Sequence, residues 1–82
     1  MFERGTVVKS AAGKDKGSLL VVVGSDKGKV YLCDGKTRPL ERAKSKNIRH
    51  IECTPFILND GMMTTNRQLR RALNELARAQ GR

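Results

Sequence analysis

Aromatic and apolar side chains are scarce in this chain of 82 residues. There is no tryptophan, only Phe2, Tyr31 and Phe56 carry aromatic rings, and hydrophobic residues make up 38% of the sequence. A core must therefore be assembled mainly from Val, Leu and Ile. A chain of this length is expected to form one small domain, with little room for an internal substrate pocket beside its core.

Catalytic and metal-ligating patterns are also lacking. His50 is the only histidine, and no nucleophile stands in a motif typical of covalent catalysis. Cys33 and Cys53 form no C-x-x-C pair, and together with His50 they supply only three of the four ligands that a structural zinc site needs. The sequence therefore predicts no enzyme, no metal site and no cofactor.

Long apolar segments are missing as well. The longest strictly apolar run, residues 19–23, is far too short to cross a bilayer, and the first residues contain no apolar signal segment. These features predict a cytoplasmic protein with reduced cysteines and without a membrane partner.

Acidic residues are few beside the basic ones. Seventeen Lys and Arg face eight Asp and Glu, which gives a formal net charge of +9. Excess positive charge attracts polyanions, and nucleic acid is the commonest of these. The charge balance therefore favours a nucleic-acid partner, and the alternative is a basic surface that only keeps a small protein in solution.

Strand and turn signals dominate the first two thirds of the chain. Five short strands are expected, at residues 6–10, 18–23, 29–33, 36–40 and 48–51. Tight turns are expected at residues 25–28 and at Asp34-Gly35. Because the run at 19–23 is apolar throughout, its strand should be buried on both faces. Short strands joined by tight turns favour a small SH3-like barrel.

One amphipathic helix is expected at the C-terminal end. Thr65 can cap it, with Gln68 completing a capping box. Helical spacing places Leu69, Ala72, Leu73, Leu76 and Ala77 on one apolar stripe. That stripe packs on the rest of the chain or on a protein partner, and the sequence leaves both open. The predicted organisation is a barrel at 1–53, a linker at 54–64 and a helix at 65–81.

Three basic clusters are candidate RNA contacts. The first is the loop at 13–17, where the glycines let the backbone turn sharply and the lysines offer ammonium groups to phosphates. Its predicted contacts are Gly13, Lys14, Lys16 and Gly17. The segment 36–50 contributes Lys36, Arg38, Arg42, Lys44, Lys46 and Arg49. The polar face of the helix contributes Arg67, Arg71 and Arg78, and arginine binds phosphate in bidentate fashion. For each cluster the alternative is an ordinary solvated surface.

The residues from 7 to 17, together with the apolar run at 19–23, resemble a KOW motif. The stretch 34–40 and the pattern Lys44-x-Lys46-Asn47-x-x-His50 are similar to those of KOW-bearing large-subunit ribosomal proteins of archaea and eukaryotes, and of their small bacterial relatives. Leu20 departs from the many KOW motifs that place a further glycine there. The resemblance implies an SH3-like barrel, with Gly13, Lys14, Lys16 and Gly17 in the motif loop, and binding to ribosomal or other structured RNA.

These observations lead to one hypothesis and one alternative. The hypothesis is a mainly β, KOW-type protein that binds RNA through phosphate contacts and associates with the ribosome. The alternative is a barrel that contacts the proteins of the transcription or translation machinery, with the apolar stripe of the helix as its docking surface.

Overall fold

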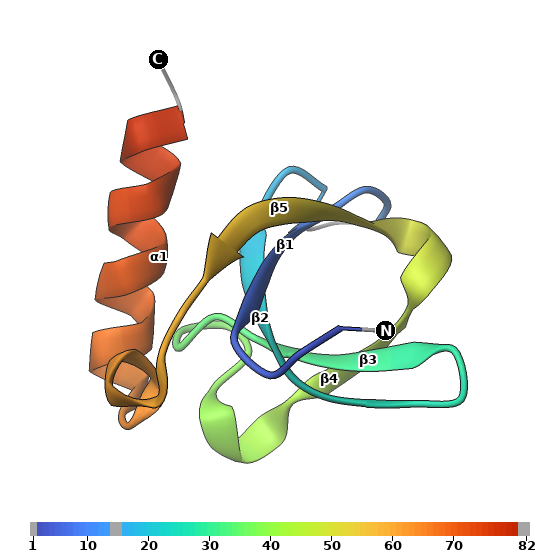
Figure 1. Cartoon of the computed structure of the whole chain (residues 1–82), viewed down its shortest axis with the longest axis horizontal. Coiled ribbons are helices and arrows are strands. Elements are labelled where there is room, and N and C mark those ends of the chain that lie inside the picture. The colour runs from blue at the N-terminus through green and yellow to red at the C-terminus, as the bar shows by residue number, and fades with distance from the viewer. Residues whose placement is uncertain (1, 14–15, 81–82) are drawn as a thin grey trace.

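The chain folds into a curled antiparallel sheet with one helix packed against its outside (Figure 1). The computed structural model describes residues 2–13 and 16–80. Its strands are β1 (Thr6–Ser10), β2 (Leu19–Asp26), β3 (Lys29–Cys33), β4 (Lys44–Asn47) and β5 (Ile51–Ile57), in the order β4-β3-β2-β1-β5. The chain also contains three short 3₁₀ helices. η1 (Leu40–Arg42) lies between β3 and β4, η2 (Ile48–His50) lies between β4 and β5, and η3 (Asp60–Met63) precedes the helix α1 (Asn66–Gln80).

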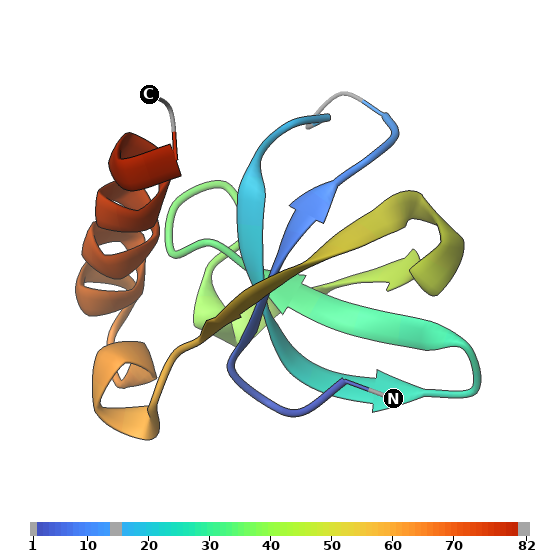
Figure 2. The same ribbon diagram turned by 45° about the horizontal axis from the view of Figure 1, so that its top comes forward.

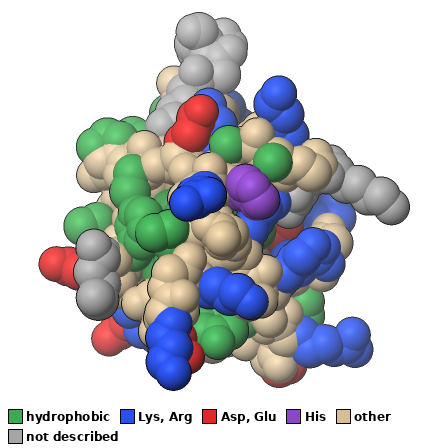
Figure 3. All heavy atoms as spheres, turned by 90° about the vertical axis from the view of Figure 1, so that its right-hand side faces the viewer, with side chains coloured by type: hydrophobic (Ala, Val, Ile, Leu, Met, Phe, Trp, Pro, Cys, Tyr) green, Lys and Arg blue, Asp and Glu red, His purple; other side chains and the backbone are tan. Residues whose placement is uncertain are grey.

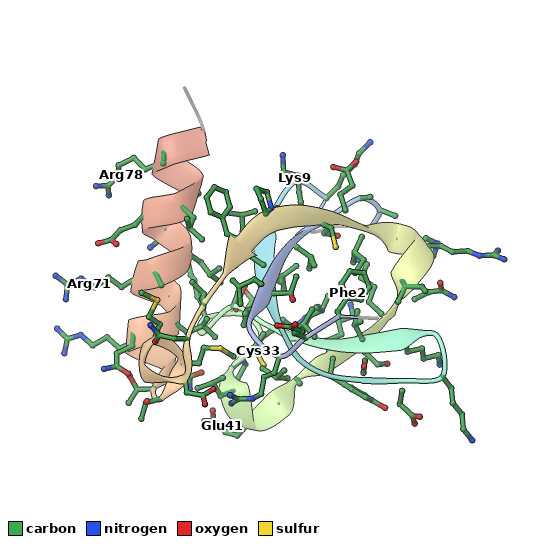
Figure 4. The ribbon with its side chains drawn as sticks, in the orientation of Figure 1. Phe2, Lys9, Cys33, Glu41, Arg71 and Arg78 are labelled. Carbon is green, nitrogen blue, oxygen red and sulfur yellow. The ribbon has the colours of Figure 1, made fainter. Side chains whose placement is uncertain are left out.

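The expectation of a mainly β fold followed by a C-terminal helix is confirmed. Every neighbouring pair of strands is antiparallel. Among the described residues no strand pairing joins β4 to β5, so the hydrogen-bonded sheet is open between these two edges. The curl nevertheless brings both edges round an apolar interior, and Phe2 lies within it (Figure 4).

The apolar run at 19–23 is buried on both sides of the sheet, as expected from its composition. On the inner side, Val8, Leu20, Val22, Val30 and Leu32 form a cluster that we call the inner core. On the outer side, Val7, Val21, Cys33, Leu58, Met63, Leu69 and Leu73 form a second cluster, the outer core. Successive side chains of a strand point to opposite faces, so one strand serves both clusters.

The turn between β2 and β3 matches its sequence. Lys27 and Gly28 both have positive φ, at 47° and 81°, which suits the two-residue turns that join antiparallel strands. The flanking β2 continues to Asp26, three residues beyond its predicted end.

The strand predicted at 36–40 is wrong. Asp34 Oδ1 accepts hydrogen bonds from the backbone N–H groups of Lys36 and Arg38, both at 2.8 Å, and this closes a loop in place of a ladder. Residues 40–42 then form η1, and β3 pairs with β4, whose sequence Lys-Ser-Lys-Asn carries no strand signal.

The strand predicted at 48–51 is also wrong except at its last residue. Residues 48–50 form η2, which Asn47 caps by accepting a hydrogen bond from the Arg49 N–H. Strand β5 runs from Ile51 to Ile57, so the boundary predicted at residue 53 falls inside a strand.

The helix begins as its capping signal predicts. Thr65 Oγ1 accepts a hydrogen bond from the Gln68 N–H at 3.1 Å, and α1 starts at Asn66. Gly81, the last residue of the predicted helix, lies outside the described residues. Leu69 and Leu73 are buried in the outer core, with Ala72 and Leu76 partly buried against it, while Ala77 is exposed. The apolar stripe therefore packs on the chain's own sheet.

A close backbone contact fixes the helix against the segment after β3, which lies between α1 and the sheet in both views (Figures 1 and 2). A Cβ at Gly35 would stand 2.3 Å from the Asn66 carbonyl oxygen, so only glycine fits there. Asn66 accepts a hydrogen bond from the Leu40 N–H and donates one to Glu41 Oε1 at 2.8 Å. The start of α1 and the loop before η1 are thus one packed unit.

Candidate nucleic-acid interface

A cleft of about 670 Å³ opens at one end of the curled sheet. The loop after β1, the loop after β3, strand β4 and η2 all contribute to it. Its lining residues are Ala12, Gly13, Ser18, Leu20, Asp34, Thr37, Arg38, Lys44, Lys46 and His50. We call it the sheet-end cleft. It places Gly13 of the loop at 13–17 beside Arg38 and Lys44 of the segment 36–50.

Lys46 has a structural task within this cleft. Its ammonium group donates to Ser10 Oγ at 2.7 Å and to the Ala12 carbonyl at 2.9 Å. These bonds tie the edge strand β4 to the end of β1. The ammonium group of Lys46, which the sequence predicts as a phosphate contact, is thus directed at the protein's own loop.

Arg38 is held on the wall of the cleft by its loop. Its carbonyl oxygen accepts hydrogen bonds from the N–H groups of Asp34 and Gly35, at 2.9 and 3.2 Å. The half-buried side chain also lines a neighbouring hollow with Arg42 and Lys44. Its Nε is buried without a hydrogen-bond partner among the described residues. Arg38 thus presents a planar cation to two adjoining hollows.

The glycines of the predicted motif loop adopt backbone angles that other residues avoid. Gly13 and Gly17 have φ of 87° and 90°. The Gly17 N–H donates to the Ser10 carbonyl at 2.8 Å, which closes the loop at its base. Gly13 lines the sheet-end cleft, whereas Lys16 is exposed outside it. Lys14, the other lysine predicted to bind phosphate, lies outside the described residues.

The outer face of α1 is basic. Arg67, Arg71 and Arg78 are exposed, and Arg71 and Arg78 point away from the sheet (Figure 4). With Arg70, Asn74 and Glu75 they surround a shallow hollow on the helix surface. Arg70 was not among the predicted contacts, although at 100° per residue it falls on the flank of the apolar stripe, facing the sheet loops.

The separate hollows adjoin one another through shared residues. The cleft and the hollow beside Arg42 share Thr37, Arg38 and Lys44. The cleft shares Ser18 and Asp34 with a groove that also contains Lys36 and Arg70. That groove shares Arg70 and Asn74 with the helix face. Together these residues form what we call the basic band: Arg42, Lys44, Arg38, Lys36, Arg70, Arg67, Arg71 and Arg78.

Two acidic side chains beside the band, Asp34 and Glu41, accept hydrogen bonds from the protein. Asp34 Oδ1 accepts the two backbone bonds of its own loop. Glu41 accepts a hydrogen bond from Asn66, and this bond lowers the pKa of the Glu41 carboxyl below its usual value. Figure 3 shows Lys and Arg side chains also gathered around the histidine on the face that carries η2, where Arg49 is exposed outside the cleft.

The two thiols have different surroundings. Cys33 is buried in the outer core, and burial is the main reason that its pKa is raised, with smaller contributions from the charges of Asp34 and Glu41. Cys53 is exposed. Within residues 2–13 and 16–80, no group of three or more His, Cys, Asp or Glu is arranged to hold a metal ion.

Comparisons with known proteins add no family. No protein-family model matches the chain, and a search of curated proteins finds no significant match. The KOW resemblance therefore stays a prediction that rests on the residues quoted above. In the part of the chain that the structure describes, no helix is both long and apolar enough to cross a membrane.

Proposed function

We propose that this protein is a non-enzymatic, cytoplasmic RNA-binding module of the KOW type that associates with the ribosome. The observation that carries the proposal is the continuity of the basic band. Eight cations from two distant parts of the sequence line hollows that share residues with one another. A continuous track of this kind suits a polyanionic backbone better than isolated charges would.

The curled sheet supports the SH3-like part of the proposal. Five short antiparallel strands wrap an apolar interior, and tight turns join β2 to β3 and close the loop after β1. The loop that resembles the KOW motif lies at the same end as the cleft. In this proposal the sheet is a scaffold, and its loops carry the contacts.

The burial of the helix stripe weakens the alternative function. A protein-interaction module was suggested by the leucines of α1, on the assumption that they lack a partner. Leu69 and Leu73 are buried against the sheet, so they are unavailable to a second protein. What α1 leaves exposed is its arginine face, which favours the same polyanion as the rest of the band.

Binding would rest on arginines and lysines that replace counterions along the RNA backbone. The logarithm of the binding constant should then fall linearly with the logarithm of the salt concentration, with a slope of about −4 to −5 for five or six phosphate contacts. A titration of structured ribosomal RNA at several salt concentrations measures this slope. A slope near zero would contradict the proposal.

A matched pair of variants tests the location of the contacts. Lys44→Gln removes one charge from the band, and Lys29→Gln removes one exposed charge from β3, beside the β2–β3 turn and away from the band. The first should reduce the slope by about 0.7–0.9, and the second should leave it unchanged. Co-sedimentation of the tagged protein with ribosomal subunits, reversed by high salt, tests the ribosomal partner.

A further inference from the structure

The sheet-end cleft differs in character from the rest of the basic band. Its lining includes the half-buried Ala12 and, at its base, Leu20, which is 2% exposed, beside the cations Arg38 and Lys44 and the acid Asp34. Its volume of about 670 Å³ lies within the range of roughly 300–1,000 Å³ that is usual for ligand pockets. Phosphate contacts need only a charged surface, whereas an apolar hollow with cationic walls suits the ring of a nucleobase.

Two side chains with planar groups, Arg38 and His50, line this cleft, and each belongs to a short turn that is held by hydrogen bonds. Arg38 belongs to the loop that Asp34 closes, and its Nε has no partner among the described residues. His50 belongs to η2, where its carbonyl oxygen accepts a hydrogen bond from the Ala11 N–H at 2.8 Å. Unpaired bases stack on guanidinium and imidazole planes. In a chain with so few aromatic residues, these two groups supply the stacking surfaces.

The basic band approaches the cleft from two sides. Arg42 lies in the hollow on one side, and Lys36 and Arg70 line the groove on the other. A backbone that follows the band would pass over the cleft with phosphates bound on both sides. A paired base cannot leave its stack without a cost in free energy, but an unpaired base can enter such a cleft readily.

We infer that the sheet-end cleft binds one unpaired nucleotide, so that the protein prefers bulged or single-stranded RNA to a continuous duplex. This inference rests on the proposed RNA binding and adds the class of RNA that is recognised. The nucleotide would place its base against Arg38, His50 and the apolar floor, while its neighbouring phosphates contact the band.

The test uses two RNA hairpins that differ by one nucleotide. One carries a single unpaired 2-aminopurine as a bulge, and the other is the same hairpin fully paired. The protein should bind the bulged hairpin about tenfold more tightly, since base stacking on a side chain has an effect of this size. The fluorescence of the 2-aminopurine should change when the protein binds.

Two substitutions and a control locate the base. His50→Ala and Arg38→Lys should each lower the ratio of affinities for the bulged and the paired hairpin to well under half of the parent's value. Arg38→Lys should do so although it keeps the positive charge. Arg49→Ala removes a charge from the same 3₁₀ helix but not from the cleft, so the preference should persist. Thermal melts establish that each variant is folded.

The outcomes separate this inference from the proposed function. Equal affinity of the parent protein for both hairpins, with a normal salt slope, would overturn the inference and leave RNA binding intact. A preference retained in both His50→Ala and Arg38→Lys would place the base elsewhere and also overturn it. Absence of salt-dependent binding to either hairpin would overturn both proposals.

Discussion

The two cores of this protein are built from different parts of the chain. The buried residues of the inner core all lie between Val8 and Leu32, on three successive strands joined by short loops. The outer core runs from Val7 to Leu73 and needs the segment after β5 and the helix. The inner core is therefore local in sequence, and the outer core is not. Helix α1 therefore completes the fold by covering the outer face of the sheet.

The largest expected effects come from truncating one leucine in each core. Leu32→Ala and Leu73→Ala should each lower the free energy of unfolding by about 2–5 kcal/mol, because each side chain is buried and leaves a cavity. Urea denaturation measures both. If Leu73→Ala costs less than about 1 kcal/mol while Leu32→Ala costs the full amount, the outer core is not a true second core.

Two glycines test how tightly the helix is seated. Gly35 and Gly17 have φ of 80° and 90°, so alanine is strained at both. A Cβ at Gly35 would also meet the Asn66 carbonyl, whereas a Cβ at Gly17 has no atom within 4 Å. Gly35→Ala should therefore cost about 1–3 kcal/mol more than Gly17→Ala, which is the usual cost of overpacking. Equal losses would mean that the contact with α1 is loose.

The buried thiol offers a test by pH. Burial raises the pKa of Cys33 above the usual thiol value of 9.0. The folded state therefore holds this proton more tightly than the unfolded state, and the resulting stability is present below pH 9.0 and lost as the pH rises through the raised pKa. Between about pH 8 and pH 10.5, the free energy of unfolding should fall more steeply for the parent than for Cys33→Ala.

The exposed thiol serves as the control for that experiment. Cys53→Ala removes a thiol that is exposed and lies outside both cores, so it controls for the loss of a thiol as such. Identical pH dependence in the parent and in Cys33→Ala would show that the outer core admits water to the thiol.

The smallest effect on stability is expected on the far side of the helix. Replacing Arg67, Arg71 and Arg78 by Gln should change the free energy of unfolding by no more than about 0.5 kcal/mol, because these side chains are exposed. The same variant should bind RNA less tightly, with a salt slope shallower by about 2. Melting and titration of one preparation measure both. Parental RNA affinity would restrict the function to the sheet loops.

Much of the strand pattern could be predicted because its signals are local. The strands at 6–10 and 29–33 have the predicted bounds, and the cap at Thr65 is in place. Alternation of side chains, positive φ at glycine and capping hydrogen bonds each depend on a few neighbouring residues. The error at 36–40 has the same origin. Asp34-Gly35 is a local hairpin signal, but the Asp34 side chain accepts hydrogen bonds from the loop N–H groups and a loop forms in place of a hairpin.

The candidate site was predicted only in pieces. Most of its charges were chosen from the sequence, but Arg70 was omitted and the bonds of Lys46 to the protein's own loop were not predicted. No local signal shows that Lys46 reaches across to Ser10, thirty-six residues away. The continuity of the band depends on which loops meet in space, and charge density along the chain does not contain that information.

Local sequence is sufficient to predict the mainly β fold, the amphipathic helix and the strong positive charge, because periodicity, turn chemistry and composition act over short distances along the chain. The tertiary structure alone decided that Lys44–Asn47 becomes a strand, since this segment lacks strand-forming residues and is ordered by pairing with β3. It also decided that the stripe of α1 covers the outer core and that separate basic clusters adjoin. The physical reason is that burial and pairing are set by partners far away in the chain, which local preference does not specify.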